Sequence, residues 1–283
     1  MSLGCRVTVV DRSGRSRRDA AAGAAVVESI SELPDVDGVV VAVPTVAHAR
    51  VVEDLLPRGV PIFVEKPLTA DPAAARRLAE AAPDRLFVMD KWRYHPGIER
   101  LAEIARSGEL GPVLGLRTTR VDWGNPHDDV DAVWILLPHD LAIALEVLGH
   151  VPAARSASAI ARGNEAWVMV ALLGTEPSVV AEVSALTPRR RRAVVLHCLQ
   201  GVAVLDDAYD DHIQVWPGAA GQPRPPAPEK RSISNEMPLL RELRAFVDHL
   251  AGGPPPRSSA AEGAMIVSRI SELRRLAGLD RPS

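Results

Sequence analysis

The sequence predicts an α/β N-terminal domain with a parallel sheet, incomplete at its N-terminus, followed by an α+β domain with a largely antiparallel, open sheet. Over the first 92 residues, short apolar segments alternate with helix-like segments, which is the pattern of a parallel sheet. After residue 150, strand-like segments follow one another without intervening helices, which indicates an antiparallel sheet. At 283 residues the chain is long enough for two such domains.

The first domain is predicted over residues 1–92. Its strands are expected at residues 6–10, 38–43, 61–64 and 86–89, and its helices at residues 50–58 and 72–82. Asp71 and Pro72 mark the start of the second helix, because aspartate is a favoured N-cap and proline is favoured at the first helical position. Strand, crossover helix and strand in succession predict a single parallel sheet.

The second domain is predicted over residues 93–283. Helices are expected at residues 95–107, 137–148, 239–250 and 260–276, and strands at residues 113–123, 154–161, 166–173, 179–185, 193–198, 202–206 and 212–216. Gly149 ends the second of these helices, and the proline-rich residues 221–230 predict a surface loop. The arginine run at residues 189–192 is interpreted as a solvated turn between strands.

The composition is that of an ordinary globular protein. With 47% hydrophobic residues, 24% charged residues and a net charge of −3, the chain lacks the basic footprint of a nucleic-acid-binding protein. No stretch reaches the roughly 18 apolar residues of a membrane span. Cys5, Cys198 and the histidines lack metal-ligand spacing, so we expect no metal. The first residues lead straight into a strand without a signal peptide, so the cytoplasm is the expected compartment.

Lys66 is the most informative residue of the sequence. Residues 64–68 read Val-Glu-Lys-Pro-Leu at the end of one predicted strand, and Pro44 and Thr45 close the strand before it. In open α/β sheets, ligands bind outside the carboxyl ends of the strands. The sequence therefore places the Lys66 ammonium at a binding edge, and a surface salt bridge is the alternative.

The succession of strand, Pro-Thr turn, helix, strand and Glu-Lys-Pro resembles the glucose-fructose oxidoreductase, inositol dehydrogenase and rhizopine catabolism (Gfo/Idh/MocA) family over nearly the whole chain. The resemblance implies a Rossmann-like first domain that binds NAD or NADP, with Lys66 between the nicotinamide and a small-molecule substrate. It also implies C-terminal helices that pack back on the first domain, and a homodimer or homotetramer formed through the open sheet. Pro44, Thr45, His48 and Glu65 are then expected near the cofactor, with helix capping as the alternative for His48.

One element of the dinucleotide-binding pattern is missing from the sequence. A Gly-x-Gly-x-x-Gly turn normally brings backbone amides to the pyrophosphate, and an acidic residue about 20 positions later binds the ribose. Asp11 supplies the acid, but no such turn precedes it. Asp11 favours NAD, whereas Arg12 beside it could accept a 2′-phosphate, and a plain strand-end aspartate is the alternative.

The missing strand would occupy the middle of the sheet in the strand order 3-2-1-4-5-6, so its absence would remove hydrogen-bond partners from its neighbours. Two explanations remain open. Either the gene start lies further upstream, or the protein has lost the phosphate-binding turn and closes its sheet in another way. The cofactor is then NAD or NADP if the dinucleotide site is functional, and none otherwise.

His139 is the second candidate for proton transfer. Residues 134–140, Trp-Ile-Leu-Leu-Pro-His-Asp, stand at the expected start of a helix and resemble the family motif Asp-x-Gly-x-His. The aspartate of that motif falls on Ile135, so one proton-handling carboxylate is replaced. The resemblance implies that Lys66 and His139 share the proton of a carbinol, and that Asp140 lies in the pocket and caps or buttresses the helix. A histidine that satisfies backbone groups at the helix start is the alternative.

Four further residues are candidates for lining the substrate pocket. Arg93, Tyr94 and His95 fall where the family has a segment between its domains, and the forked donors of Arg93 suit a carboxylate or a phosphate. Trp123 ends a predicted strand that could face the same cleft. The alternatives are interdomain packing for the first three and a solvated turn for Trp123.

The sequence leaves three functions open. The first is an NAD(P)-dependent oxidoreductase that acts on a sugar, a nucleotide sugar or a related polyol. The second is a cofactor-independent acid–base enzyme for isomerisation, elimination or cyclisation, which the absent glycine turn and Ile135 motivate. The third is a non-catalytic relative that binds a ligand in the same cleft.

Overall fold

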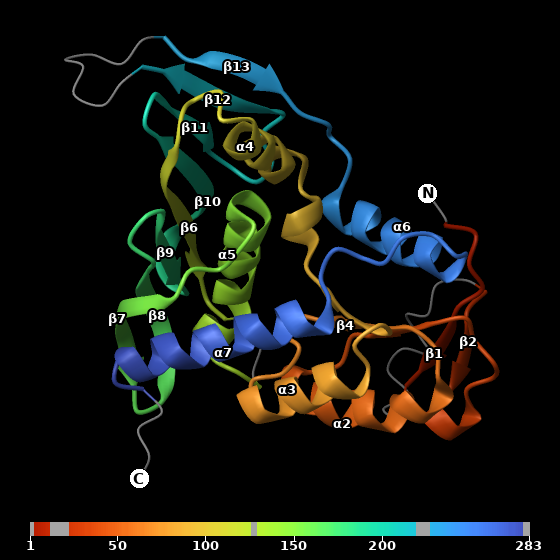
Figure 1. The fold of residues 1–283 in the computed structure, drawn as a ribbon. Helices are drawn as coiled ribbons and strands as arrows, with labels where there is room; N and C mark the ends of the chain where they lie inside the picture. The colour runs from red at the N-terminus through yellow and green to blue at the C-terminus, as the bar shows by residue number, and fades with distance from the viewer. Residues whose placement is uncertain (1–2, 12–22, 126–128, 219–226, 280–283) are drawn as a thin grey trace.

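The computed structural model describes residues 3–11, 23–125, 129–218 and 227–279 of the chain. It contains a smaller domain with parallel strands and a larger domain built on one extended sheet (Figure 1). Helices fill the space between the two sheet systems (Figure 1). The predicted fold class is confirmed.

All strand pairs of the small domain are parallel. Its strands are β1 (Thr8–Val10), β2 (Ala25–Val27), β3 (Val39–Val41), β4 (Ile62–Glu65) and β5 (Leu86–Met89), and its helices are η1 (Ile30–Glu32), α2 (Thr45–Leu55), η2 (Leu56–Arg58) and α3 (Pro72–Ala81). Asp71 caps α3 by accepting a hydrogen bond from the Ala73 amide at 2.8 Å. The sequence analysis missed β2, because three residues are too few to show a strand period.

The parallel sheet of the small domain is divided. Within the described residues, β1 and β2 form one sheet and β3 to β5 form another, and no ladder joins the two. The strands β1 and β3 border this break. Val7, just before β1, is 55% exposed, and Val40, within β3, is 46% exposed. In the strand order 3-2-1-4-5-6, the position at the break belongs to the central strand. Both β1 and β3 therefore present an edge without a ladder partner.

The large domain contains one mixed sheet. Its strands are β6 (Val113–Trp123), β7 (Ala154–Arg162), β8 (Glu165–Leu173), β9 (Ser178–Ser184), β10 (Leu186–Cys198), β11 (Gly201–Leu205), β12 (His212–Pro217) and β13 (Glu229–Ser232). The order is β13-β12-β11-β10-β6-β9-β8-β7. Every ladder is antiparallel except that between β6 and β9, so the largely antiparallel sheet is confirmed.

Two predicted connections in this domain are wrong. The arginine run at residues 189–192 lies inside β10 and not in a turn. Arg191 and Arg192 pair with β6, and the first two arginines fall within a register shift of that ladder. Residues 229–230 of the predicted loop belong to β13, which pairs with β12 at the edge of the sheet. Charged side chains are common on edge strands, so their composition resembles that of a loop.

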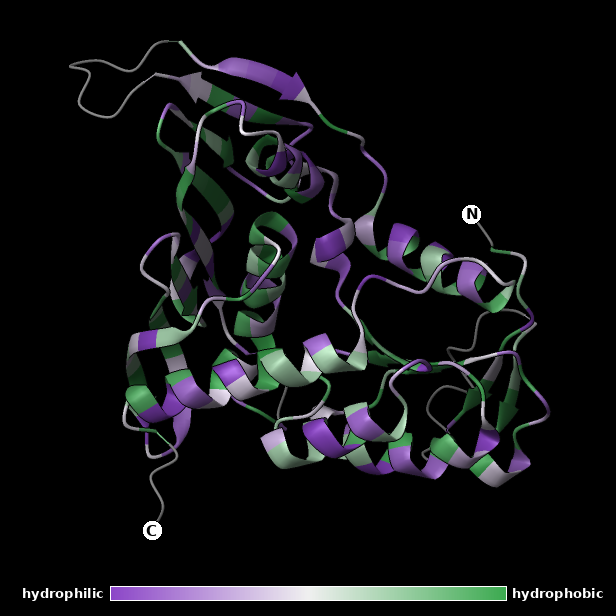
Figure 2. Ribbon diagram, viewed as in Figure 1, coloured by the Kyte–Doolittle hydropathy of each residue, from purple (hydrophilic) through white to green (hydrophobic). Residues whose placement is uncertain are grey.

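The apolar helix α5 (Ala132–Leu148) packs against β6, β8 and β9 of the large sheet. It begins at Ala132 and not at residue 137, because Asp131 caps it by accepting hydrogen bonds from the Val133 and Trp134 amides at 3.1 and 3.2 Å. Pro138 therefore lies inside the helix and does not start it. Figure 2 shows α5 as apolar over most of its length, in keeping with burial on nearly every side.

The C-terminal helices lie against the small domain. They are α6 (Pro238–Leu250) and α7 (Ala260–Leu276), while η3 (Lys91–Tyr94) and α4 (Pro96–Ser107) connect β5 to the large sheet. The rings of Phe63 in β4 and Phe246 in α6 stack with centroids 4.8 Å apart. Gly263 of α7 lies so close to β5 that an added Cβ would stand 2.5 Å from a methyl carbon of Val88. These close contacts fix the two domains relative to each other.

Candidate active site

Lys66 follows β4 at the carboxyl end of the parallel strands. Its Nζ donates a hydrogen bond to the backbone carbonyl of Ile135 in α5 at 3.1 Å, so the side chain crosses from one domain to the other. Burial lowers the pKa of Lys66, while the negative charges of Glu65 and Asp90 raise it. The site thus contains a partly buried amine between the end of the sheet and α5.

Asp90 and His139 face each other within electrostatic reach of Lys66. Asp90 Oδ1 lies 3.8 Å from His139 Nδ1, and neither atom has a hydrogen-bond partner among the described residues. Asp90 is 2% exposed, and burial raises its pKa to about 8 although the charges of Arg93 and Lys66 lower it. Burial holds the pKa of His139 well below its usual range, and the Lys66 charge acts in the same direction. Near neutral pH the proton of this pair therefore resides on Asp90.

Asp140, the residue after His139, points to the large sheet. It accepts a hydrogen bond from Arg120 Nε of β6 at 2.9 Å, and both side chains are buried. The Arg120 guanidinium also lies over the Trp92 ring, 4.2 Å from its centroid. Asp140 stands in the middle of α5, so it buttresses the helix against β6 and does not cap it. Its contacts make it a support of the site rather than part of a substrate pocket.

The residues expected near a cofactor lie at the carboxyl ends of the small-domain strands. Asp11 is buried directly after β1, Pro44 is exposed before α2, and Thr45 is buried at the first position of α2. Glu65 ends β4, and its Oε2 accepts a hydrogen bond from the Lys66 amide at 3.2 Å. Arg12 lies outside the described residues.

His48 connects the ends of two strands. Its Nδ1 lies 2.9 Å from the carbonyl oxygen of Pro67, and its Nε2 lies 2.9 Å from that of Val43. The ring is 1% exposed and does not cap α2, whose N-cap residue is Pro44. His48 therefore ties the segment that follows Lys66 to the end of β3, and the capping alternative is wrong.

Arg93 and Tyr94 turn away from Lys66 and toward the C-terminal helices. Arg93 donates to Glu146 at 3.1 Å and to Glu262 at 3.0 Å, which joins η3 to α5 and α7. The Tyr94 hydroxyl accepts a hydrogen bond from the Arg257 amide at 2.9 Å. These contacts favour interdomain packing over pocket lining, because the charge of Arg93 is already paired within the chain.

His95 and Trp123 are the other two candidates for the substrate pocket. His95 is the N-cap of α4, where Nδ1 accepts from the Gly97 amide at 3.1 Å and Nε2 lies 2.9 Å from the Ala208 carbonyl oxygen. Trp123 is 67% exposed at the end of β6. The contacts of His95 favour the alternative of interdomain packing over pocket lining. Trp123 lies on the surface of this chain.

Sequence reasoning missed three buried charged residues near Lys66. Asp90 follows β5 directly, so the strand-end rule that singled out Lys66 would have found it. Arg120 lies within a strand, and Glu242 lies on α6 among other charged residues, so neither carries a local signal. Burial raises the pKa of Glu242 to about 9, and the charge of Asp90 adds to that effect.

In the described part of the chain, no group of three His, Cys, Asp or Glu side chains is arranged to hold a metal ion. None of the helices described there is long and apolar enough to cross a membrane.

Comparison with known proteins finds a family match in the first domain. Residues 6–88 match the Gfo/Idh/MocA model, which describes an oxidoreductase family with an NAD-binding Rossmann fold. The chain is 26% identical over 255 residues to UDP-N-acetylglucosamine 3-dehydrogenase of Acidithiobacillus ferrooxidans, a match that covers 86% of this chain and 79% of that protein.

Solved structures share the fold of this protein. Levoglucosan dehydrogenase in complex with NADH and levoglucosan has a TM-score of 0.83 at 15% identity, covering 96% of this chain and 88% of that one. An oxidoreductase from Agrobacterium radiobacter in complex with NAD⁺, L-tartaric acid and magnesium has a TM-score of 0.81 at 16% identity, covering 97% and 89%. The likeness extends over both domains.

Proposed function

We propose that this protein belongs to the Gfo/Idh/MocA family and is an NAD(P)-dependent oxidoreductase that acts on a sugar, a nucleotide sugar or a related polyol. The observation that carries the proposal is the convergence of Lys66, Asp90 and His139 where the ends of β4 and β5 meet α5. The relatives support the substrate class, since one is a UDP-N-acetylglucosamine dehydrogenase and another was solved with levoglucosan.

The carboxyl ends of β1, β3 and β4 supply groups that fit a nicotinamide dinucleotide. The buried Asp11 suits the ribose hydroxyls, Thr45 lies at the start of α2, and Lys66 lies at the nicotinamide end beside the substrate. When bound, the nicotinamide would exchange a hydride with the carbinol carbon. No Gly-x-Gly-x-x-Gly turn occurs in the 283 residues, so we assign none of them to the pyrophosphate.

A carbinol that is oxidised must also lose its hydroxyl proton, and we assign His139 as the base. Its Nδ1 faces Asp90, which leaves Nε2 for the substrate hydroxyl. An ionised Asp90 stabilises the imidazolium that forms. The Lys66 ammonium donates a hydrogen bond to the substrate oxygen as that oxygen becomes a carbonyl.

Asp90 takes the place of the carboxylate that the family motif carries at the position of Ile135. Ile135 still contacts Lys66, but through its backbone carbonyl, which orients the amine and does not titrate. The titrating acid comes instead from the end of β5. The departure of the motif from its usual form is therefore compatible with proton transfer in this chain.

The proposal predicts that nicotinamide binding and turnover both occur in the purified chain and that turnover requires Lys66. NADH and NADPH are titrated by fluorescence, and oxidation of a panel of sugars and polyols is followed by nicotinamide absorbance. Replacing Lys66 with Met should lower kcat by about 10²- to 10⁴-fold, the usual contribution of a positioned proton-handling group. Lys230→Met, at an exposed position of β13, is the matched control.

Two outcomes would contradict the proposal. One is the absence of cofactor binding at about 1 mM nicotinamide, which corresponds to a very weak complex. The other is conversion of a sugar at an undiminished rate without any nicotinamide, which is what the acid–base alternative requires.

A further inference from the structure

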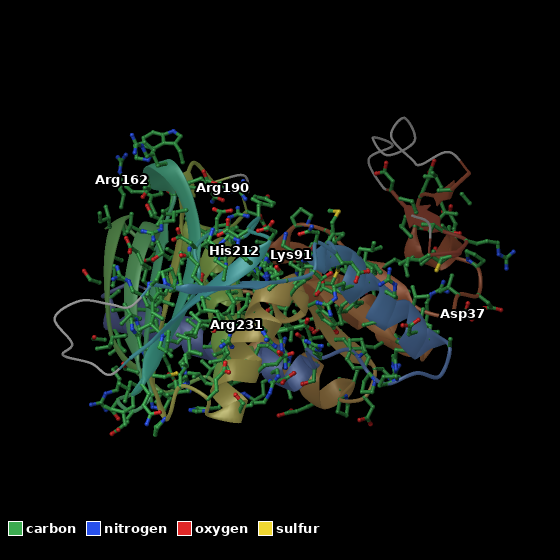
Figure 3. All side chains as sticks on the ribbon, turned by 90° about the horizontal axis from the view of Figure 1, so that it is seen from above. Asp37, Lys91, Arg162, Arg190, His212 and Arg231 are labelled. Carbon is green, nitrogen blue, oxygen red and sulfur yellow. The ribbon has the colours of Figure 1, made fainter. Side chains whose placement is uncertain are left out.

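Two basic side chains within electrostatic reach of His139 have no role in the proposed proton transfer, Arg192 of β10 and Lys91 of η3. Together with Arg190, which approaches the same Asp122 oxygen as Arg192, they form what we call the basic rim. The charges of Lys91 and Arg192 both lower the pKa of His139, so both lie within electrostatic reach of its ring. Lys91 lies between the large sheet and the small domain, toward the middle of the molecule (Figure 3).

The register of the sheet shows which way Arg192 faces. Arg192 of β10 stands directly opposite Arg120 of β6. Residues opposite each other in an antiparallel pair project from the same face of the sheet. Arg120 reaches α5 on that face and binds Asp140 there at 2.9 Å. Arg192 therefore projects from the same face of the sheet as α5, which carries His139.

The basic rim has more positive than negative charge. Arg120 is neutralised by Asp140, but among the described residues the nearest carboxylate oxygen to Arg192 is that of Asp122 at 3.9 Å. The same oxygen is shared with Arg190, also at 3.9 Å. The Arg192 side chain is only 26% exposed, and burial together with the charges of Arg120 and Arg190 lowers its pKa. Among the described residues no carboxylate oxygen comes closer to Arg192 than 3.9 Å, so an added anion beside this guanidinium would form charge-assisted hydrogen bonds with it.

We propose that the substrate carries an anionic oxygen group, a phosphate or a carboxylate, which binds Arg192 with support from Arg190 and Lys91. This inference rests on the proposed function and narrows its substrate class to anionic sugars. A guanidinium presents parallel N–H donors that match two oxygens of such a group, which sets orientation as well as affinity. The carbinol to be oxidised then lies between this anchor and Lys66.

Binding of the anion also changes the base. Because the cations of the basic rim disfavour the imidazolium of His139, an anion among them offsets that effect. His139 becomes a better proton acceptor only when the charged substrate is in place. A neutral sugar of the same shape would bind and leave His139 poorly basic, so the rim discriminates in kcat as well as in KM.

The test compares matched ligands by calorimetry, without nicotinamide. The pairs are glucose 6-phosphate with glucose, glucuronate with glucose, and UDP-N-acetylglucosamine with N-acetylglucosamine, so the phosphate and carboxylate arms are separate. At least one anionic member should bind about tenfold more tightly than its neutral partner, as charge-assisted hydrogen bonds imply. Arg192→Gln should abolish that preference and leave neutral binding unchanged.

Two further variants guard against a loss of folding. Asp122→Asn removes the carboxylate that approaches Arg190 and Arg192 at 3.9 Å, so anion binding should become about threefold tighter, an effect that misfolding cannot produce. Arg162→Gln, at an exposed position of β7 far from Lys91 in Figure 3, should bind every ligand as the wild type does.

Three results would overturn the inference. They are equal binding of the charged and neutral ligand in every pair, a preference for the anion that persists in Arg192→Gln, and no anion binding at about 10 mM, which corresponds to a very weak affinity. The same experiments distinguish failure of this inference from failure of the proposed function. If the protein oxidises only a neutral sugar, the proposed function stands and the anionic substrate is wrong. If it binds the anion but shows no turnover with nicotinamide, the proposed function is wrong and the anion site at the basic rim stands.

Discussion

At the scale of single residues, the chemistry of this protein is set by which charged groups are buried together. Burial disfavours the charged form of both Asp90 and His139, so it raises the pKa of the aspartate and lowers that of the histidine. The nearby cations Lys66 and Arg120 lower both pKa values, which opposes burial at Asp90 and adds to it at His139. The pair therefore titrates as a unit and holds one proton near neutral pH. Its reactive form, with Asp90 ionised and His139 neutral, becomes abundant as the pH rises.

The pH dependence of oxidation follows from this arrangement. With the pKa of Asp90 at about 8, kcat/KM should rise as the pH approaches 8 and level off above it, because the ionised form supports the base. In Asp90→Asn this rising limb should vanish and kcat should fall by about 10²-fold. Initial rates between pH 6 and 10 measure both.

Asp84→Asn, at an exposed position before β5, is the matched control for Asp90. A rising limb that persists in Asp90→Asn would show that another group controls the titration. Since Asp90 is fully buried, circular dichroism of the variant accompanies the rates.

At the scale of elements, α5 positions the site. It carries His139 and the Ile135 carbonyl that binds Lys66, and its start depends on Asp131. Besides capping the helix, Asp131 pairs with Arg274 of α7, and both side chains are nearly inaccessible. Pro138 lacks the amide that would reach the carbonyl four residues earlier, so this helix relies on packing and on its cap.

Removal of the cap predicts a loss of stability. Asp131→Ala should lower the free energy of unfolding by about 3 kcal/mol, because it leaves the buried Arg274 without its charge partner and the helix without its cap. Asp131→Asn keeps a capping oxygen, so its free energy of unfolding should fall by less than that of Asp131→Ala. Urea unfolding followed by circular dichroism measures both, and a change in Asp131→Ala below about 0.5 kcal/mol, the range of surface substitutions, would contradict the prediction.

At the scale of the whole molecule, the large sheet has one face covered by helices and one apolar face open. Along β8, Met169, Ala171 and Leu173 are buried, whereas Val170 and Leu172 between them are 44% and 39% exposed. Alternate residues of a strand point to opposite faces, so the exposed set lies on the outer face of the sheet. An exposed apolar face of this kind is typical of a subunit contact.

We therefore expect a homo-oligomer that assembles through this face, and Val170→Asp should shift it to the monomer by burying an unpaired charge. Sedimentation velocity over a range of protein concentrations measures the effect. Ala81→Asp, at an exposed position of α3, is the matched control. A wild-type chain that sediments as a monomer at every concentration would exclude the contact.

The sequence was a good guide wherever structure depends on local pattern. α4, α6, α7 and most strands of the large sheet begin and end within a few residues of their predicted positions, because burial of one face imposes a period of two or of 3.6. The exceptions are β10, which begins at Leu186 and not at residue 193, and β13, which starts within the predicted loop. The errors fall where a local signal has two meanings. The sequence predicts that the helix carrying His139 begins at residue 137 and that the arginines at residues 189–192 lie in a turn, although Pro138 and the arginines lie inside elements.

The sequence alone determined the fold class, the place of Lys66 at a strand end and the candidacy of His139. Only the tertiary structure decided that Asp90 joins them, that Arg93 is paired within the chain, and that Arg192 faces α5. The physical reason is that a pKa or an ion pair depends on burial and on neighbours from distant segments, whereas periodicity records only which face of an element avoids water.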